Sequence, residues 1–413
     1  MHIPPALKHR RFFYLWLGQL ISVAGTQMQI WAIFWHIRTL TDQPIAISGV
    51  GLARILPVIF FSLISGAVAD SYNRRKIIFI TQSSAALLAL VLGLLTLSGH
   101  ISIWLIYLIT ALQAVVVAFD GPARAALIPN LVPAEDLANA FSLNSIAFQT
   151  GAVLGPALSG LVIVVGGQAS VYIINAISYV AVLIALILIG EVPQKIQPHA
   201  NGVSLLSIKE GIRFIISRPI IFSSMILDFI ATFFASANTL MPFVANDVLH
   251  VSVVAYGWLS AAQSVGAVVA GVVISQTHQL RRQGPLFLIA VLIFGLATIG
   301  FGAATSFAVA WAALATTGAA DGVSTIIRNT IRQLQTPDEM RGRMTSVNQI
   351  FFQGGPQLGE LEAGAAAQLF GTPFAIISGG IGCIIGLGFI LLKWPKIWHY
   401  NGDEPILAGS NAD

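Results

Sequence analysis

Long apolar segments recur along the whole chain and are separated by short polar breaks. A helix needs roughly 17–25 residues to cross a bilayer, and each segment meets that length to within a few residues. The pattern therefore predicts twelve membrane-spanning helices, and an even number places both chain ends on the same side. The predicted spans are 12–37, 45–69, 77–98, 102–124, 140–165, 171–190, 220–245, 254–275, 285–304, 308–328, 345–368 and 373–393.

Composition agrees with a chain that is surrounded by lipid. Apolar residues make up 56% of the 413 residues and charged residues only 9%, whereas soluble domains carry about 25% charged residues. So few charges cannot cover a water-exposed surface, so the outer surface must face lipid. We expect an all-α inner-membrane protein whose net charge of +4 requires no nucleic-acid partner.

The distribution of basic residues predicts the orientation. If the N-terminus is cytoplasmic, all 21 lysines and arginines except Arg38 and Arg54 fall in cytoplasmic segments or at cytoplasmic helix ends. Cytoplasmic loops are enriched in basic residues, and the opposite orientation would reverse this bias. Both termini are therefore expected in the cytoplasm.

The longest internal break, 191–219, divides the spans into six plus six. It contains apolar residues at helical spacing with basic residues on another face, which predicts an amphipathic helix at the cytoplasmic surface. We expect a six-helix bundle over 1–190, a linker over 191–219, and a second bundle with a short cytoplasmic tail over 220–413. The apolar positions are Leu205, Ile208, Ile212 and Ile215, and the basic ones are Lys209 and Arg213.

The two halves resemble one another. Asp120-Gly121 and Asp321-Gly322 lie at matching cytoplasmic corners, and three residues of the following helix recur at one constant offset. Parallel six-helix repeats around a site near the bilayer midplane are typical of one class of secondary transporter. The recurring residues are Asn144, Gly151 and Gly155 in the first half, and Asn348, Gly355 and Gly359 in the second.

The turn between the second and third spans reads Gly-Ala-Val-Ala-Asp-Ser-Tyr-Asn-Arg-Arg-Lys over 66–76. This resembles the Gly-x-x-x-Asp-x-x-Gly-Arg-Arg/Lys signature of the major facilitator superfamily. Asn73 stands where the family has glycine, and we expect it to adopt the left-handed conformation that asparagine tolerates.

Each signature residue has a physical role. Gly66 is expected to let its helix approach a neighbour closely. Asp70 is expected to cap a helix or to pair with Arg124 or the helix start near Met344 when the cytoplasmic side is closed. Arg74 and Arg75 are expected to hold the turn at the anionic leaflet.

The resemblance extends over nearly the whole chain. The segments 120–124, Asp-Gly-Pro-Ala-Arg, and 335–343, Gln-Thr-Pro-Asp-Glu-Met-Arg-Gly-Arg, look like the enterobactin-exporter and macrolide-efflux branch of that superfamily. Gly151, Gly155 and Pro156 resemble the Gly-Pro motif of superfamily antiporters, although helix packing alone explains them equally well. The resemblance implies two six-helix bundles, alternating access driven by an ion gradient, and export of a drug or siderophore-like small molecule.

Ionisable residues inside the predicted spans are expensive in lipid and therefore indicate a cavity or a partner. They are Arg54, Asp228, Glu360 and Glu362. Polar residues at helical spacing also form one face of three helices, which favours either a cavity lining or hydrogen bonds between helices. The three faces are Gln19, Ser22, Thr26 and Gln29; Asp228, Thr232 and Ser236; and Gln349, Gln353, Gln357 and Glu360.

These residues suggest roles in coupling transport to an ion gradient. Arg54 is expected to pair with Glu360 or Glu362 in one transport state. Asp228 has no basic residue within its own helix, which makes it the better proton carrier, and we expect it to face the central cavity. Glu360 is then the better gate or substrate contact.

Other functions leave these features unexplained. The chain contains no Walker-type phosphate loop, zinc-protease motif or nucleophile elbow, so we expect no enzyme activity, no cofactor and no metal. We expect a monomer that contacts its small-molecule substrate, membrane lipid and the proton gradient. Two alternatives remain: an importer with the same fold, and a receptor or scaffold that transports nothing.

Overall fold

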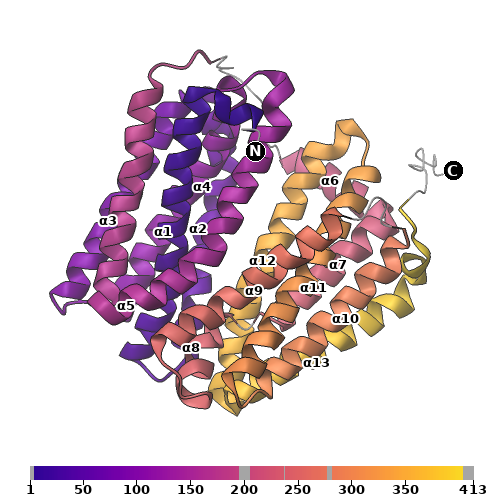
Figure 1. Cartoon of the computed structure of the whole chain (residues 1–413). Coiled ribbons are helices and arrows are strands. Elements are labelled where there is room, and N and C mark those ends of the chain that lie inside the picture. Colours follow the sequence, from indigo (N-terminus) through magenta and orange to yellow (C-terminus); the bar gives the residue numbers. More distant parts are fainter. Residues whose placement is uncertain (1–3, 195–204, 237, 277–280, 403–413) are drawn as a thin grey trace. The chain divides into compact units, whose positions relative to one another are not determined.

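The computed structural model describes residues 4–194, 205–236, 238–276 and 281–402. Within these ranges every regular element is helical, as the apolar pattern predicted. The first five helices follow one another through short connections (Figure 1). They are α1 (Arg10–Leu40), α2 (Pro44–Ser71), α3 (Arg74–Leu97), α4 (Ile103–Leu127) and α5 (Leu137–Ile189).

The second half of the chain begins with the predicted amphipathic helix. The helices here are α6 (Leu205–Ser217), α7 (Pro219–Phe234), α8 (Met241–Phe243), α9 (Val253–Ser275), α10 (Gln283–Gly302), α11 (Phe307–Leu334), α12 (Asp338–Phe370) and α13 (Thr372–Lys393). Short helical turns lie between or beside the helices of both halves. They are η1 (Pro5–Lys8), η2 (Ile128–Asn130) and η3 (Ala134–Asp136) in the first half, and η4 (Asn238–Leu240), the π-helix η5 (Val244–Val248) and η6 (Pro395–His399) in the second.

Eleven of the twelve predicted spans coincide with helices to within a few residues, whereas the seventh, 220–245, is divided among α7, η4, α8 and η5 and includes residue 237, which lies outside the described residues. The fifth and sixth spans join as α5, which is interrupted at Gly167, where φ is 70°. A positive φ suits glycine and not residues with a Cβ, so the break lies in the gap that the sequence predicted between 165 and 171.

Eight of the described helical stretches are long and apolar enough to cross a membrane by length and composition alone, and the stretch Ala134–Ile189 has length for two crossings. Helices α1, α11 and α12 are not among them. Helices α1 and α12 carry most of the polar residues that the sequence placed inside the membrane, and these residues lower their hydropathy.

The structure divides into two compact units. The first comprises Met1–Val203 together with Val251–Ala261, and the second comprises Ser204–His250 together with Ala262–Asp413. Each unit has its own buried core of aliphatic and aromatic side chains.

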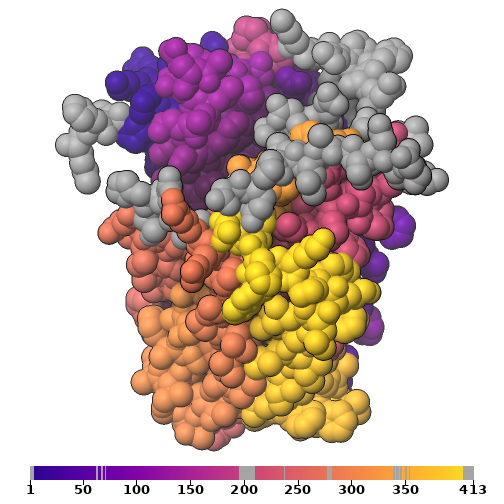
Figure 2. Space-filling view, turned by 90° about the vertical axis from the view of Figure 1, so that its right-hand side faces the viewer, coloured from indigo at the N-terminus to yellow at the C-terminus, as the bar shows by residue number. Residues whose placement is uncertain are grey.

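The outward faces of the helices are apolar, as a lipid environment requires. Helix α13, drawn in yellow, covers much of one face of the second unit (Figure 2). Its residues Ile381, Ile385, Phe389 and Leu392 are exposed, while Cys383 on the opposite face is fully buried. A helix with apolar residues on both its buried and its exposed faces is typical of a membrane span.

The repeated glycines make equivalent contacts in the two units. A Cβ at Gly151 or Gly155 of α5 would meet α1 closely, and a Cβ at Gly355 or Gly359 of α12 would meet α7 closely. Each pair therefore lets the fifth helix of one half lie against the first helix of the same half. The internal repeat therefore appears as the same packing contact in both halves, in which small residues let two helix backbones approach closely.

We expect Gly359→Val to destabilise the protein by ~1–3 kcal/mol, because the added side chain would collide with the backbone of Phe233. Gly388→Ala on α13 is the matched control, since no described atom lies within 4 Å of its Cβ position. Thermal unfolding of the detergent-purified variants measures both. Equal midpoints for Gly359→Val and wild type would show that this packing contact is not required.

Candidate functional site

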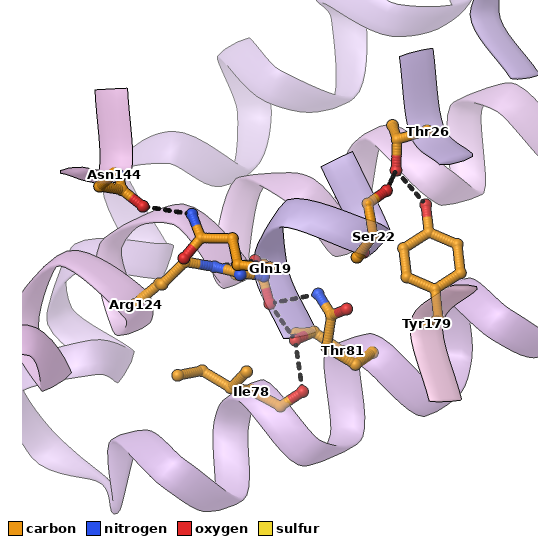
Figure 3. A network of polar contacts seen from close by, with 10 residues as sticks. Gln19, Ser22, Thr26, Ile78, Thr81, Arg124, Asn144 and Tyr179 are labelled. Carbon is orange, nitrogen blue, oxygen red and sulfur yellow. Dashed lines mark hydrogen bonds and ion pairs between the residues drawn. The ribbon is translucent and has the colours of Figure 1, made fainter. Parts of the chain in front are cut away.

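In the first unit, polar side chains converge on Asp120 of α4; Thr81 and Arg124 of this network are labelled in Figure 3. One carboxylate oxygen accepts hydrogen bonds from Thr81 Oγ1 at 2.8 Å and from Gln82 Nε2 at 2.9 Å. The other accepts two from Arg124, at 3.0 Å from Nε and 2.5 Å from Nη2. One carboxylate thus meets one guanidinium with its remaining acceptor sites occupied, which is the arrangement that makes a buried pair tolerable.

The polar face of α1 is used for hydrogen bonds to other helices. Gln19 donates to an asparagine of α5, Thr26 Oγ1 lies 3.0 Å from a tyrosine hydroxyl of α5, and Gln29 donates to a glutamine of α4 at 2.7 Å. Gln29 also accepts from an asparagine of α5 at 2.7 Å. The structure therefore favours interhelical hydrogen bonding for this face. The partners are Asn144, Tyr179, Gln113 and Asn175.

In the second unit, a buried arginine joins two carboxylates. Arg328 of α11 forms an ion pair through Nη1 with Asp228 of α7. Its Nη2 lies 3.3 Å from Oδ1 of Asp321, which precedes it by seven residues on the same helix. Nη2 also donates to Thr325 Oγ1 at 2.7 Å. The side chains of Arg328 and Asp228 are 4% and 5% exposed, whereas that of Asp321 is 50% exposed.

This contact changes the prediction made for Asp228. The absence of a base in its own helix does not leave Asp228 unpaired, because α11 supplies Arg328. Asp228 is almost fully buried, with 4% of its surface exposed, and its place at the central cavity stays a prediction. Its neighbour on the predicted polar face, Thr232, donates to the Asp228 carbonyl oxygen at 2.8 Å, so that face is partly occupied by local hydrogen bonds.

Arg332, one turn after Arg328, is bound by amide oxygens. Its guanidinium donates to Asn329 on its own helix and to Asn348 on α12. Asn348 is the repeat of Asn144, which binds Gln19 in the first unit. The same position thus connects to a neighbouring helix in each half, although the partner residues differ.

The carboxylates of α12 lie in partly buried positions. Glu360 is 6% exposed, and Oε2 of Glu362 is buried without a hydrogen-bond partner among the described residues. Gln357 is half-buried, while the side chains of Gln349 and Gln353 lie outside the described residues. No ion pair is recorded for Arg54 within the described part of its unit, and its pairing with a glutamate of the other unit stays a prediction.

The signature turn differs from expectation in its details. Asn73 has φ −63° and is not left-handed. It is the N-cap of α3, where its side chain accepts from the backbone N–H of Lys76 at 3.2 Å. An asparagine is a preferred N-cap residue, which explains why it replaces glycine here.

The basic residues of the turn bind the protein itself. Arg74 Nε donates to the carbonyl of Ala69 at 3.3 Å, and Arg75 Nε donates to that of Leu186 at 2.8 Å. The close approach expected at Gly66 is absent among the described residues, since nothing lies within 4 Å of its Cβ position. The side chain of Asp70 lies outside the described residues.

Sequence reasoning missed Arg328, and it treated Asp321 only as a corner residue. A signal was present, because Asp321, Thr325 and Arg328 are separated by four and three residues and therefore share one helix face. Arg328 was counted only as part of the positive charge at a cytoplasmic helix end.

The whole chain matches one protein family. The model of a family described as transmembrane secretion effector matches residues 4–401. The chain belongs to this family. As a transmembrane secretion effector of the major facilitator superfamily, it is a multi-pass inner-membrane protein.

Curated relatives of this transmembrane secretion effector include enterobactin exporters. It is 26% identical to the enterobactin exporter EntS of Escherichia coli O9:H4 (strain HS) over 406 residues, which are 98% of this chain and 96% of the relative. It is 27% identical over the same length to EntS of Shigella boydii serotype 18 (strain CDC 3083-94 / BS512).

Solved structures share the fold. A bacterial homolog of the human lysosomal transporter Spinster, in an inward-facing and unoccupied conformation, has a TM-score of 0.73 at 17% identity, with 96% of this chain and 98% of that chain covered. A POT family transporter in complex with 5-aminolevulinic acid has a TM-score of 0.70 at 16% identity, with coverage of 95% and 97%. These likenesses establish the major-facilitator fold and carry no information about substrate.

We expect Asp120→Ala to lower the free energy of unfolding by ~3–5 kcal/mol, because it leaves the Arg124 guanidinium buried without its carboxylate. Asp120→Asn, which keeps acceptor capacity towards Thr81 and Gln82, should cost less. Thermal unfolding in detergent compares the two. If Asp120→Ala unfolds at the wild-type temperature, the cluster does not hold this corner together.

Proposed function

We propose that this protein exports a siderophore-like small molecule from the cytoplasm, by alternating access and at the expense of the proton gradient. The observation that carries the proposal is the match to enterobactin exporters over 98% of the chain, within a family of secretion effectors. The cargo and the direction come from those relatives, and the coupling ion comes from the chemistry of the second unit.

The buried ion pair of the second unit supports coupling to protons. Asp228 and Arg328 are almost fully buried, and removing two charges from water costs several kcal/mol per ion. Residues that serve only to pack helices do not need such a pair, because apolar side chains of the same volume pack as well or better. A carboxylate that releases its arginine partner when it is protonated would give this pair a function, which accounts for the desolvation cost of burying it.

The proposed orientation places both termini in the cytoplasm, and we propose a monomer. Helix α6 supports this orientation. Ile215 is buried against Met344 and other residues of the second unit, while Ile212, Ile216 and Arg213 are exposed. An amphipathic helix with exposed apolar and basic residues suits the interface between the cytoplasmic leaflet and water.

An importer with the same fold is the competing function, and the direction of flux separates the two. A receptor or scaffold would show no gradient-dependent flux at all. Both are outcomes of the following experiment.

We expect the protein to restore secretion of enterobactin in an Escherichia coli strain that lacks EntS, and everted vesicles to accumulate enterobactin when a proton gradient is imposed. Asp228→Asn should still reach the membrane, because the amide is isosteric and cheaper to bury. It should lose uphill accumulation by at least about tenfold, since a charge-assisted contact is worth roughly 1.5–3 kcal/mol. Immunoblotting of membranes controls for expression.

Accumulation in right-side-out vesicles instead of everted ones would make the protein an importer. No flux in either, with the protein present in the membrane, would favour the receptor. Full proton-driven export by Asp228→Asn would leave Glu360 or Glu362 as the coupling residue.

We further propose that Asp70 stabilises the state that is closed to the cytoplasm, together with Arg74, Arg75 and Arg124 of the same unit. Asp70→Asn keeps the shape and removes the charge. We expect the cytoplasmically closed state to lose roughly 1.5–3 kcal/mol relative to the open one. Single cysteines near the cytoplasmic helix ends should then react faster with a membrane-impermeant thiol reagent in everted vesicles. Unchanged labelling and unchanged export would exclude this role.

A further inference from the structure

The two units carry the same aspartate at their repeated corners but surround it differently. Asp120 has one guanidinium to itself and two neutral donors on its other oxygen. Asp321 shares its guanidinium, that of Arg328, with a second carboxylate, Asp228. The corner of the first unit is therefore a complete ion pair, whereas the corner of the second has one cation between two anions.

Among the described residues, no further ion pair joins Asp228, Arg328 or Asp321. Arg332 is the nearest other cation on α11, and its hydrogen bonds go to asparagine oxygens, which leave its positive charge uncompensated. Helix α12, which packs on α7, carries Glu360 and Glu362 within its span, and α10 has no charged residue. The remaining charged or titratable groups of the neighbouring elements lie mostly near helix ends. They are Asp338, Glu339, Arg341 and Arg343 at the start of α12, whose side chains lie outside the described residues; Cys383 and Lys393 on α13; Lys209, Glu210 and Arg213 on α6; Arg218 before α7; Arg281 and Arg282 before α10; and Lys396 and His399 on η6.

Arg328 and its two carboxylates together carry one net negative charge, and one proton on a carboxylate would neutralise these three groups. Arg332, one turn further along α11, lies close enough to offset part of this negative charge. Of the three groups, Asp321 is the most accessible, with its side chain half exposed, whereas Asp228 and Arg328 are almost fully buried. The second anion beside Arg328 makes the cluster as a whole easier to protonate than an isolated aspartate–arginine pair such as that of Asp120.

We propose that Asp228, Arg328 and Asp321 form a proton-operated clasp between α7 and α11. With Asp228 ionised, Arg328 spans the two helices. When a proton neutralises Asp228, Arg328 stays with Asp321 and Thr325 on its own helix, and the polar tie to α7 is released. The proton enters from water and returns to water, and no other bond is made or broken. This clasp rests on the proposed export function.

The packing around α7 would allow this helix to move relative to its neighbours when its ion pair with α11 breaks. Its later part lies against glycines of two other helices: Thr232 and Phe233 meet Gly355 and Gly359 of α12, and Phe234 meets Gly379 and Gly382 of α13. Glycines offer no side chains to interlock with α7. The helix also ends at Phe234 and is followed by the short turns η4, α8 and η5 instead of a continuous helix.

In this arrangement Arg328 and Asp321 are positioning residues that set when Asp228 takes its proton. Two substitutions should therefore act in opposite directions. Asp321→Asn leaves Arg328 to Asp228 alone, so Asp228 should stay ionised to lower pH. Arg328→Gln removes the cation and leaves two facing carboxylates, so the cluster should take up its proton at higher pH.

Infrared difference spectroscopy of the protonated carboxyl band, recorded against pH on the detergent-purified full-length protein, measures this uptake directly. We expect the component that Asp228→Asn removes to move down by about one pH unit or more in Asp321→Asn and up by a similar amount in Arg328→Gln, the scale of shift that one neighbouring charge produces. Arg328→Lys keeps the charge and should stay close to wild type, which guards against misfolding of Arg328→Gln. Asp120→Asn is the matched control from the first unit and should leave this component in place.

Shifts in opposite directions support the clasp. Shifts in the same direction, no shift, or a protonated-carboxyl component that Asp228→Asn does not remove would overturn it. The vesicle assay distinguishes this failure from failure of the proposed function. If the vesicles export enterobactin but the infrared titration shows no opposite shifts, the export function holds and the clasp is excluded. If the opposite shifts appear but no enterobactin is transported, the clasp holds and enterobactin is excluded as the substrate.

Discussion

A bilayer offers the polypeptide backbone no hydrogen-bond partners, and this constraint shapes every part of the protein. Each crossing segment must satisfy its own N–H and C=O groups, so the chain is built from helices. The same constraint applies to polar side chains inside the membrane, which also need hydrogen-bond partners. A glutamine, aspartate or arginine within the apolar layer is stabilised by a polar partner, and the hydrogen bonds around Gln19, Asn144 and Asp120 in the first unit supply such partners.

The two halves use the same helix-packing contacts, but they neutralise their repeated aspartates differently. Repeated glycines bring the fifth helix of each half against the first, at Gly151 and Gly155 in one and at Gly355 and Gly359 in the other. The repeated aspartates have diverged, because Asp120 is neutralised by Arg124 within its own helix while Asp321 competes for Arg328 with Asp228. The two halves thus share a packing scaffold and differ in the charges placed at its repeated corners.

Membership of the transmembrane secretion effector family accounts for the fold of this protein. The structural neighbours share the fold at 16–17% identity, which shows that the helical scaffold tolerates very different sequences. Buried polar groups that face other helices, such as Gln29 with Gln113 and Asn175, are bound to one another, so a residue's polarity alone does not make it a substrate contact.

The sequence by itself determined the number and positions of the membrane helices, because apolar length is a local property that lipid reads directly. It also identified the repeat and the family resemblance, which depend on residue identity and spacing. It could not predict which polar groups meet, since hydrogen bonds between helices join residues that are 16 to 225 positions apart. Asp228 was recognised as unusual from its place in an apolar helix, yet its partner Arg328 lies one hundred residues away and looked like an ordinary helix-end cation. Only the packing of α7 beside α11 brought the two together, because tertiary structure alone decides which faces of separate helices share a buried, low-dielectric space.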